Sequence, residues 1–80
     1  MGMLEEIGER LVRFRTQAGL DVETAARTTG IGTDRLEVAE SGHLPLTEDE
    51  LAALASAYGV DVTEIFGGRI TRFQDYAGGP

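Results

Sequence analysis

The beginning of the chain alternates apolar and polar positions with the period of an α-helix. Apolar residues recur at steps of three and four, at Leu4, Ile7, Leu11, Phe14 and Ala18. This spacing predicts an amphipathic helix over residues 4–18. Acidic residues crowd its first turn and arginines its second half, which the helix dipole favours. We expect Gly19 to follow the C-cap and end the helix.

Two short helices joined by a tight turn are predicted next. Asp21 is a candidate N-cap for the first of them, which ends at Gly30. The "GIG" that follows indicates a tight turn, in which Gly30 is expected to adopt a positive φ. The second of these helices runs over residues 33–40, with Thr33 as a candidate cap and Leu36 facing inward.

The second half of the chain carries the plainest helix signal. Thr47 followed by Glu50 is a capping box, and Gly59 ends the helix. Its buried stripe is expected at Leu51, Leu54, Ala55 and Tyr58. A short helix over residues 62–66 follows, with Asp61 as its candidate cap. Beyond it, three apolar residues at three-residue steps predict either one more helical turn or an extended arm: Ile70, Phe73 and Tyr76.

Five short helices with a three-residue turn between the second and third predict an all-α domain. A helix pair joined in this way is typical of a helix-turn-helix. We expect the compact domain to cover residues 4–66. Residues 67–80 are expected to form a tail, a linker or a dimerisation arm.

Charge and composition limit the classes of function. The 80 residues include fourteen acids, seven arginines and no lysine, and the net charge of −7 opposes approach to nucleic acid or an anionic membrane. There is no cysteine and no apolar run of membrane-spanning length. His43 is the single histidine, and the acidic turn over residues 48–50 is expected to be solvated. We therefore predict neither a metal site nor a cofactor. Nothing predicts an enzyme, and a cytoplasmic protein is expected.

The sequence resembles the lambda-repressor-like, Xre-type family of helix-turn-helix proteins. The resemblance rests on "IGERLVRFR" with "AGL", on "AARTTGI", on "LEVAESG" and on "LPLTEDELAALASAYGVDVTEIF". It covers residues 7–66 and leaves the last fourteen residues outside. It implies a compact five-helix DNA-binding domain, acting as a transcriptional regulator or repressor that occupies a short operator as a homodimer.

The resemblance also implies roles for individual residues. Arg15 and Glu40 would form an ion pair that ties the first helix to the end of the third. The base-facing positions of the third helix would be Thr33, Asp34 and Arg35, with Val38 further along and Val22 at the start of the second helix. Contacts with the DNA backbone are expected from Ser41, His43, Arg10, Arg13 and Arg27. The dimer is expected to form through Val62, Ile65, Phe66, Ile70, Phe73 and Tyr76.

The local chemistry departs from a typical DNA-binding face. Asp34 can accept a hydrogen bond only from cytosine N4, and Val38 offers no polar contact. Residues 21–42 hold five acids and two arginines, and the loop over residues 41–46 has no lysine or arginine. A second interpretation therefore stays open. The domain would then be an acidic protein-interaction module, either an antitoxin-like partner or the N-terminal domain of a longer protein.

Overall fold

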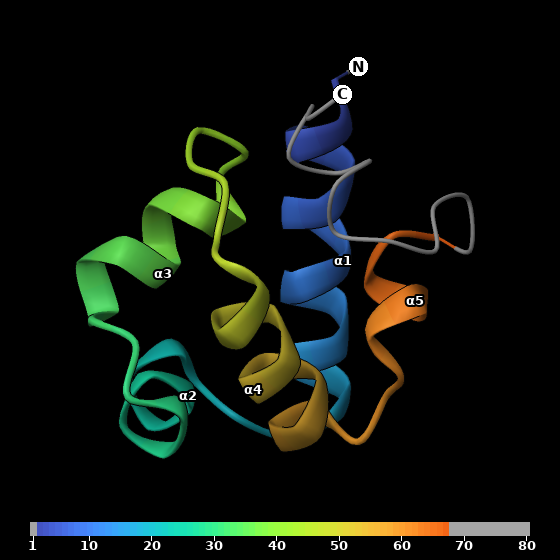
Figure 1. The fold of residues 1–80 in the computed structure, drawn as a ribbon. Helices are drawn as coiled ribbons and strands as arrows, with labels where there is room; N and C mark the ends of the chain where they lie inside the picture. The colour runs from blue at the N-terminus through green and yellow to red at the C-terminus, as the bar shows by residue number, and fades with distance from the viewer. Residues whose placement is uncertain (1, 68–80) are drawn as a thin grey trace.

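The computed structural model describes residues 2–67, which form five α-helices and no strand (Figure 1). α1 stands at the centre, with α2 and α3 on one side of it and α5 on the other. The all-α class and the five-helix order predicted from the sequence are confirmed. Residues 68–80 of the expected tail lie outside the described residues, so the division into a domain and a tail stays a prediction. The helices are α1 (Met3–Gln17), α2 (Val22–Thr29), α3 (Thr33–Glu40), α4 (Glu48–Tyr58) and α5 (Val62–Ile65).

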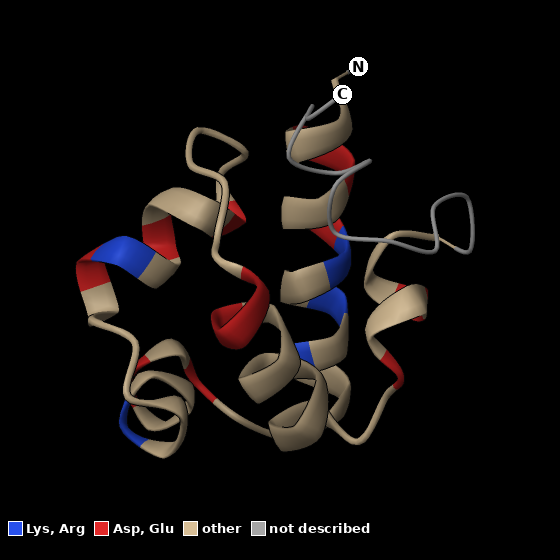
Figure 2. Cartoon of the chain, in the orientation of Figure 1, with Lys and Arg blue, Asp and Glu red and all other residues tan. Residues whose placement is uncertain are grey.

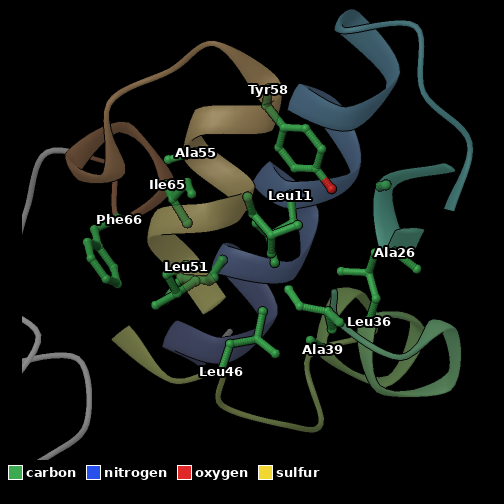
Figure 3. Packing of buried hydrophobic residues seen from close by; sticks show 14 residues of the cluster. Leu11, Ala26, Leu36, Ala39, Leu46, Leu51, Ala55, Tyr58, Ile65 and Phe66 are labelled. Atoms are coloured by element: carbon green, nitrogen blue, oxygen red, sulfur yellow. The ribbon is translucent and has the colours of Figure 1, made fainter. Parts of the chain in front are cut away.

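One apolar core draws side chains from all five helices and from the loop before α4 (Figure 3). Full burial of a leucine or isoleucine side chain stabilises the fold by about 2 kcal/mol relative to exposure. The largest fully buried side chains are Leu11, Leu36, Leu51, Leu54 and Ile65. The stripe predicted for α4 is buried as expected, and this core fixes how α2 and α3 stand against α1 and α4.

The ends of the short helices follow from local chemistry. At the start of α2, the Asp21 carboxylate accepts the backbone N–H of Thr24 at 2.7 Å. Gly30 ends the same helix with φ 79°, a left-handed conformation that glycine adopts without steric cost. The prediction that Thr33 caps α3 is wrong. The extended residue before the helix is Gly32, with φ −61° and ψ 142°, so Thr33 is already the first helical residue.

α1 approaches the end of α3 closely at Gly8. A Cβ atom on Gly8 would lie 2.9 Å from the carbonyl oxygen of Ala39, and closer still to that of Glu40. Any side chain at this position would therefore push the two helices apart. This approach brings the C-terminal end of α3 against the middle of α1. Among residues 2–67, no helix has the length and apolar character needed to cross a membrane.

Candidate nucleic-acid interface

The outer face of α3 is a surface that no other helix among residues 2–67 covers. Leu36 and Ala39 point into the core. Because successive residues turn by about 100°, Asp34 and Val38 lie on the opposite side of the helix. Both are exposed, and Val38 retains 43% of its accessible surface. Thr33 is half-buried in the first turn.

This outer face is acidic. The exposed Glu37 joins Asp34 on it, while the arginine of α3 lies elsewhere on the helix surface. Figure 2 shows red segments on α3 and on the first turn of α4. A ligand that approaches α3 from outside therefore meets carboxylates together with the apolar side chain of Val38.

Arg35 does not stand at the base-facing position that the sequence predicted. Its Nε donates to Oε2 of Glu50 at 2.6 Å, and its Nη2 donates to Oε1 of Glu50 at 2.8 Å. The guanidinium lies on the flank of α3 that faces the start of α4. The correction has a physical reason: the capping turn of α4 presents a carboxylate directly beside this flank.

Glu50 serves two helices at once. Its Oε1 also accepts the backbone N–H of Thr47 at 2.8 Å, and the Thr47 hydroxyl accepts the N–H of Glu50 at 3.1 Å. The hydrogen bonds from Arg35 and from Thr47 lower the pKa of Glu50 to about 2, against the opposing effect of partial burial. The carboxylate is therefore ionised at neutral pH while it binds Arg35.

Arg15 and Glu40 meet on the other flank of α3. Nε of Arg15 donates to Oε2 of Glu40 at 2.7 Å, and Nη2 donates to Oε1 at 3.2 Å. Nη1 donates to the carbonyl oxygen of Leu20 at 3.0 Å. The hydrogen bond with Glu40 raises the pKa of Arg15, although burial acts in the opposite direction. The structure thus joins the two residues for which the family resemblance implied an ion pair.

Tyr58 of α4 belongs to the apolar core (Figure 3), and both charges of this pair affect the pKa of its phenol. Burial raises the pKa of its phenol to about 12, and the Glu40 carboxylate adds to this shift while Arg15 opposes it. Within the described part of the chain, its buried hydroxyl has no hydrogen-bond partner. The phenol is therefore neutral and acts here as an apolar core residue.

The loop after α3 carries two of the expected backbone-contact residues. Ser41 and His43 are both exposed. The Ser41 hydroxyl donates to the carbonyl oxygen of Val38 at 2.7 Å and lies 3.0 Å from Nδ1 of His43. Because a hydroxyl has one proton to donate, this geometry favours a proton on Nδ1 of the imidazole.

The start of α2 presents the carboxylate of Asp21, which would repel a nearby phosphate. Hydrogen bonds from Thr24 lower the pKa of Asp21, and Arg27 adds a smaller electrostatic contribution. Val22 is half-buried and packs against the core, so it offers little surface to a base. Arg27 is exposed on α2 and remains a candidate for a phosphate contact.

Arg10 and Arg13 are placed away from the face of α3. They line a groove between α1 and α5, and α1 separates this groove from α3 (Figures 1 and 2). The guanidinium of Arg13 lies 5.2 Å from the ring centre of Phe14, and that of Arg10 lies 3.7 Å from a carboxylate oxygen of Glu6. The structure therefore does not bring these two arginines to a duplex bound by α3.

Some of the residues expected at the dimer interface are buried in the core of the domain. Ile65 and Phe66 retain 0% and 6% of their accessible surface, and Val62 packs against the same core. Ile65 and Phe66 were expected among the dimerisation residues, but the structure places both side chains in the core of the domain. Ile70, Phe73 and Tyr76 lie outside the described residues.

The roles of two residues, Glu50 and Gly8, were not predicted from the sequence. Glu50 was interpreted only as a capping residue, and no local signal pairs it with Arg35, which lies fifteen residues earlier. Gly8 did leave a signal, because a glycine inside an amphipathic helix weakens it by about 1 kcal/mol and commonly marks close packing. No group of three or more potential metal-ligating side chains occurs within residues 2–67.

The fold and the exposed outer face of α3 define an all-α helix-turn-helix protein. A family model described as a helix-turn-helix domain matches residues 6–65, which is most of the chain. The chain belongs to this family of helix-turn-helix domains, and this membership suggests a DNA-binding regulator. No curated protein and no solved structure matches the chain.

Proposed function

We propose that this protein is a transcriptional regulator that places the start of α3 in the major groove of a short operator. The observation that carries the proposal is the exposed outer face of α3 within a helix-turn-helix of a family associated with DNA binding. The major groove of B-DNA accommodates an α-helix, and the first turns of the second helix of this motif contact base edges. Regulation would follow from occupancy of the operator, without chemistry on it.

The side chains of this face favour particular bases. The Thr33 hydroxyl can donate or accept a hydrogen bond, and Val38 can contact the methyl group of thymine. Asp34 can accept a hydrogen bond from cytosine N4 and is repelled by the acceptors of other bases. We therefore expect an operator with cytosine and thymine at the contacted positions, and an Asp34→Asn variant that relaxes the preference for cytosine.

Contacts with the DNA backbone would be few. The candidates are Arg27 on α2 and, in the loop after α3, Ser41 and His43, all of which are exposed. Each phosphate contact adds about −0.9 to the slope of log affinity against log salt concentration, so we expect a shallow slope of about −1 to −2 for each protomer.

The regulator would act in the cytoplasm as a homodimer on paired half-sites about 34 Å apart. Since Ile65 and Phe66 belong to the core, such a dimer would have to use Val62 and residues beyond the described part of the chain. The mass of the full chain, measured by light scattering alone and on a duplex with two half-sites, tests this assembly.

A second candidate function is a protein-interaction module that retains the fold without the DNA contacts. Two observations favour it: the outer face of α3 carries Asp34 and Glu37, and Arg35 is paired with Glu50. Both reduce attraction to a polyanion. The partner would be a cognate protein, as for an antitoxin, or another domain of a longer chain.

One experiment separates these candidates. A labelled random-sequence duplex is titrated with the full chain at low salt, and binding is followed by fluorescence anisotropy. The regulator predicts a complex that weakens with added salt, and enrichment of a short motif when duplexes are selected from a random pool. Absence of a complex at tens of micromolar, where non-specific binding by DNA-binding proteins is usually visible, contradicts the regulator and favours the interaction module.

A further inference from the structure

The contact between α3 and α4 places an acid against the one arginine of the recognition helix. Glu50 holds Arg35 through two hydrogen bonds of 2.6 and 2.8 Å, while its third contact, with the N–H of Thr47, belongs to the cap of α4. Only the bond to Thr47 is needed to begin the helix. The two bonds to Arg35 therefore call for a separate explanation.

We propose that Glu50 acts as an intramolecular competitor of DNA for Arg35. Its carboxylate occupies a guanidinium edge of the kind that otherwise binds a phosphate or the O6 and N7 atoms of guanine. This inference rests on the proposed DNA-binding function and explains how the affinity of that same face is set. Glu50 would keep the domain a weak binder of DNA in general, so that only a favourable operator retains it.

Electrostatics supports competition. A phosphate that approaches Arg35 also meets the Glu50 charge beside the guanidinium, and the two charges largely cancel at the distance of a backbone contact. The first turn of α4 adds the exposed Glu48 and Asp49 nearby in the chain. Replacing Glu50 would remove this carboxylate from the flank of α3, next to the outer face that carries Asp34 and Val38.

The exposure of the Arg35–Glu50 pair distinguishes it from an ion pair that stabilises the fold. The Arg35 side chain retains 39% of its accessible surface and that of Glu50 retains 20%. Ion pairs that are this accessible to water contribute little to stability, so this one can open without unfolding the domain. A glutamine at position 50 keeps the capping box and loses the charge. The variant Glu50→Gln therefore addresses the competition rather than the fold.

The test compares Glu50→Gln with Asp49→Asn in the full chain. Both variants remove one negative charge from the first turn of α4, but only the first removes the carboxylate that binds Arg35. Each is titrated against the same labelled random duplex at several salt concentrations, after thermal unfolding has shown that both are folded. We expect Glu50→Gln to bind about three- to fivefold more tightly than Asp49→Asn, since an exposed ion pair is a weak competitor. Its salt slope should be steeper by about one.

The double variant Arg35→Ala with Glu50→Gln identifies the group responsible. If Arg35 makes the new contact, the double variant loses the gain and binds like the unmodified chain, whose net charge it shares. Equal affinity of Glu50→Gln and Asp49→Asn overturns the competition while the DNA-binding function stands. A gain that persists without Arg35 also overturns it. If neither the unmodified chain nor Glu50→Gln binds duplex at all, the proposed function fails as well.

A measurement on the unmodified chain covers the case in which Glu50→Gln does not fold. The side-chain Nε–H signal of Arg35 is followed by NMR while the random duplex is added. Competition by Glu50 predicts that this signal stays in place while backbone signals of Thr33 and Asp34 shift. A shift of the Arg35 signal together with them shows that the guanidinium binds DNA despite Glu50, and contradicts the proposal.

Discussion

Two arginine–glutamate pairs hold α3, one on each flank, and they differ mainly in burial. Arg15–Glu40 joins α3 to α1, and the two side chains retain 17% and 9% of their accessible surface. Arg35–Glu50 joins α3 to α4, with 39% and 20% retained. Both have the same bidentate chemistry through Nε and Nη2.

The difference in burial separates a structural role from a functional one. When one partner of a buried pair is removed, the other charge is left without water, which is costly. When an exposed pair is broken, water solvates both groups and little stability is lost. The Arg15–Glu40 pair therefore helps to fix the position of α3 against α1. The Arg35–Glu50 pair determines how much positive charge α3 presents to its surroundings.

The largest expected effect is the loss of stability when Arg15 is removed, compared with the loss when Arg35 is removed. Arg15→Ala leaves Glu40 as an unpaired and largely buried carboxylate, and should lower the free energy of unfolding by about 3 kcal/mol. Arg35→Ala should lower it by less than about 1 kcal/mol. Urea unfolding followed by circular dichroism measures both changes. Equal losses in the two variants would abolish the distinction between the flanks.

A somewhat smaller effect is expected at Gly8, on the same side as Arg15. Alanine normally strengthens a helix interior by about 1 kcal/mol relative to glycine. Here its Cβ would collide with the backbone of Ala39 and Glu40, so Gly8→Ala should instead destabilise by about 2 kcal/mol.

The sign of the change at Gly8 is the critical result, again measured by urea unfolding. Gly32→Ala is the matched control, because no atom lies within 4 Å of a Cβ at Gly32. Its effect should be at most about 1 kcal/mol, because Gly32 is the N-cap of α3 and alanine is a poorer N-cap residue than glycine. If Gly8→Ala were more stable than the unmodified chain, the close approach of α1 and α3 would be disproved.

The smallest expected effect is a loss of stability at low pH. Folding lowers the pKa of Glu50 from its ordinary value of 4.5 to about 2, so its ionised form stabilises the fold fully above pH 4.5. This contribution is lost as the pH falls through about 2. Relative to Glu50→Gln, the unmodified chain should lose at most about 1 kcal/mol between pH 5 and pH 2, because solvent screens the pair. A difference between the two chains that does not change over this range contradicts the pairing.

Local features of the fold could be predicted from the sequence. Asp21 and the Thr47–Glu50 box begin their helices as expected, because capping depends on residues two or three positions apart. The buried stripe of α4 followed from helical periodicity. The cap of α3 was assigned one residue too late, since Gly32, without a side chain, left no capping signal.

The tertiary surroundings of the site could not be predicted in the same way. Periodicity gives the angle of Arg35 relative to Leu36 but does not say which helix packs on that flank. The path of the loop over residues 41–46 decides this, and it brings Glu50 to Arg35. Similarly, the apolar character of Ile65 and Phe66 fits a core or an interface equally well, and only the packing of α5 distinguishes them.

The most direct test of the account is a map of the DNA contact on the full chain. Backbone amide signals are recorded by NMR while a random duplex is added at low salt. We predict that the largest shifts occur at the start of α3, at Thr33, Asp34 and Val38, with little change at Thr63 and Glu64 in the α1–α5 groove. Shifts confined to that groove, or no shifts at all, would contradict DNA binding through α3.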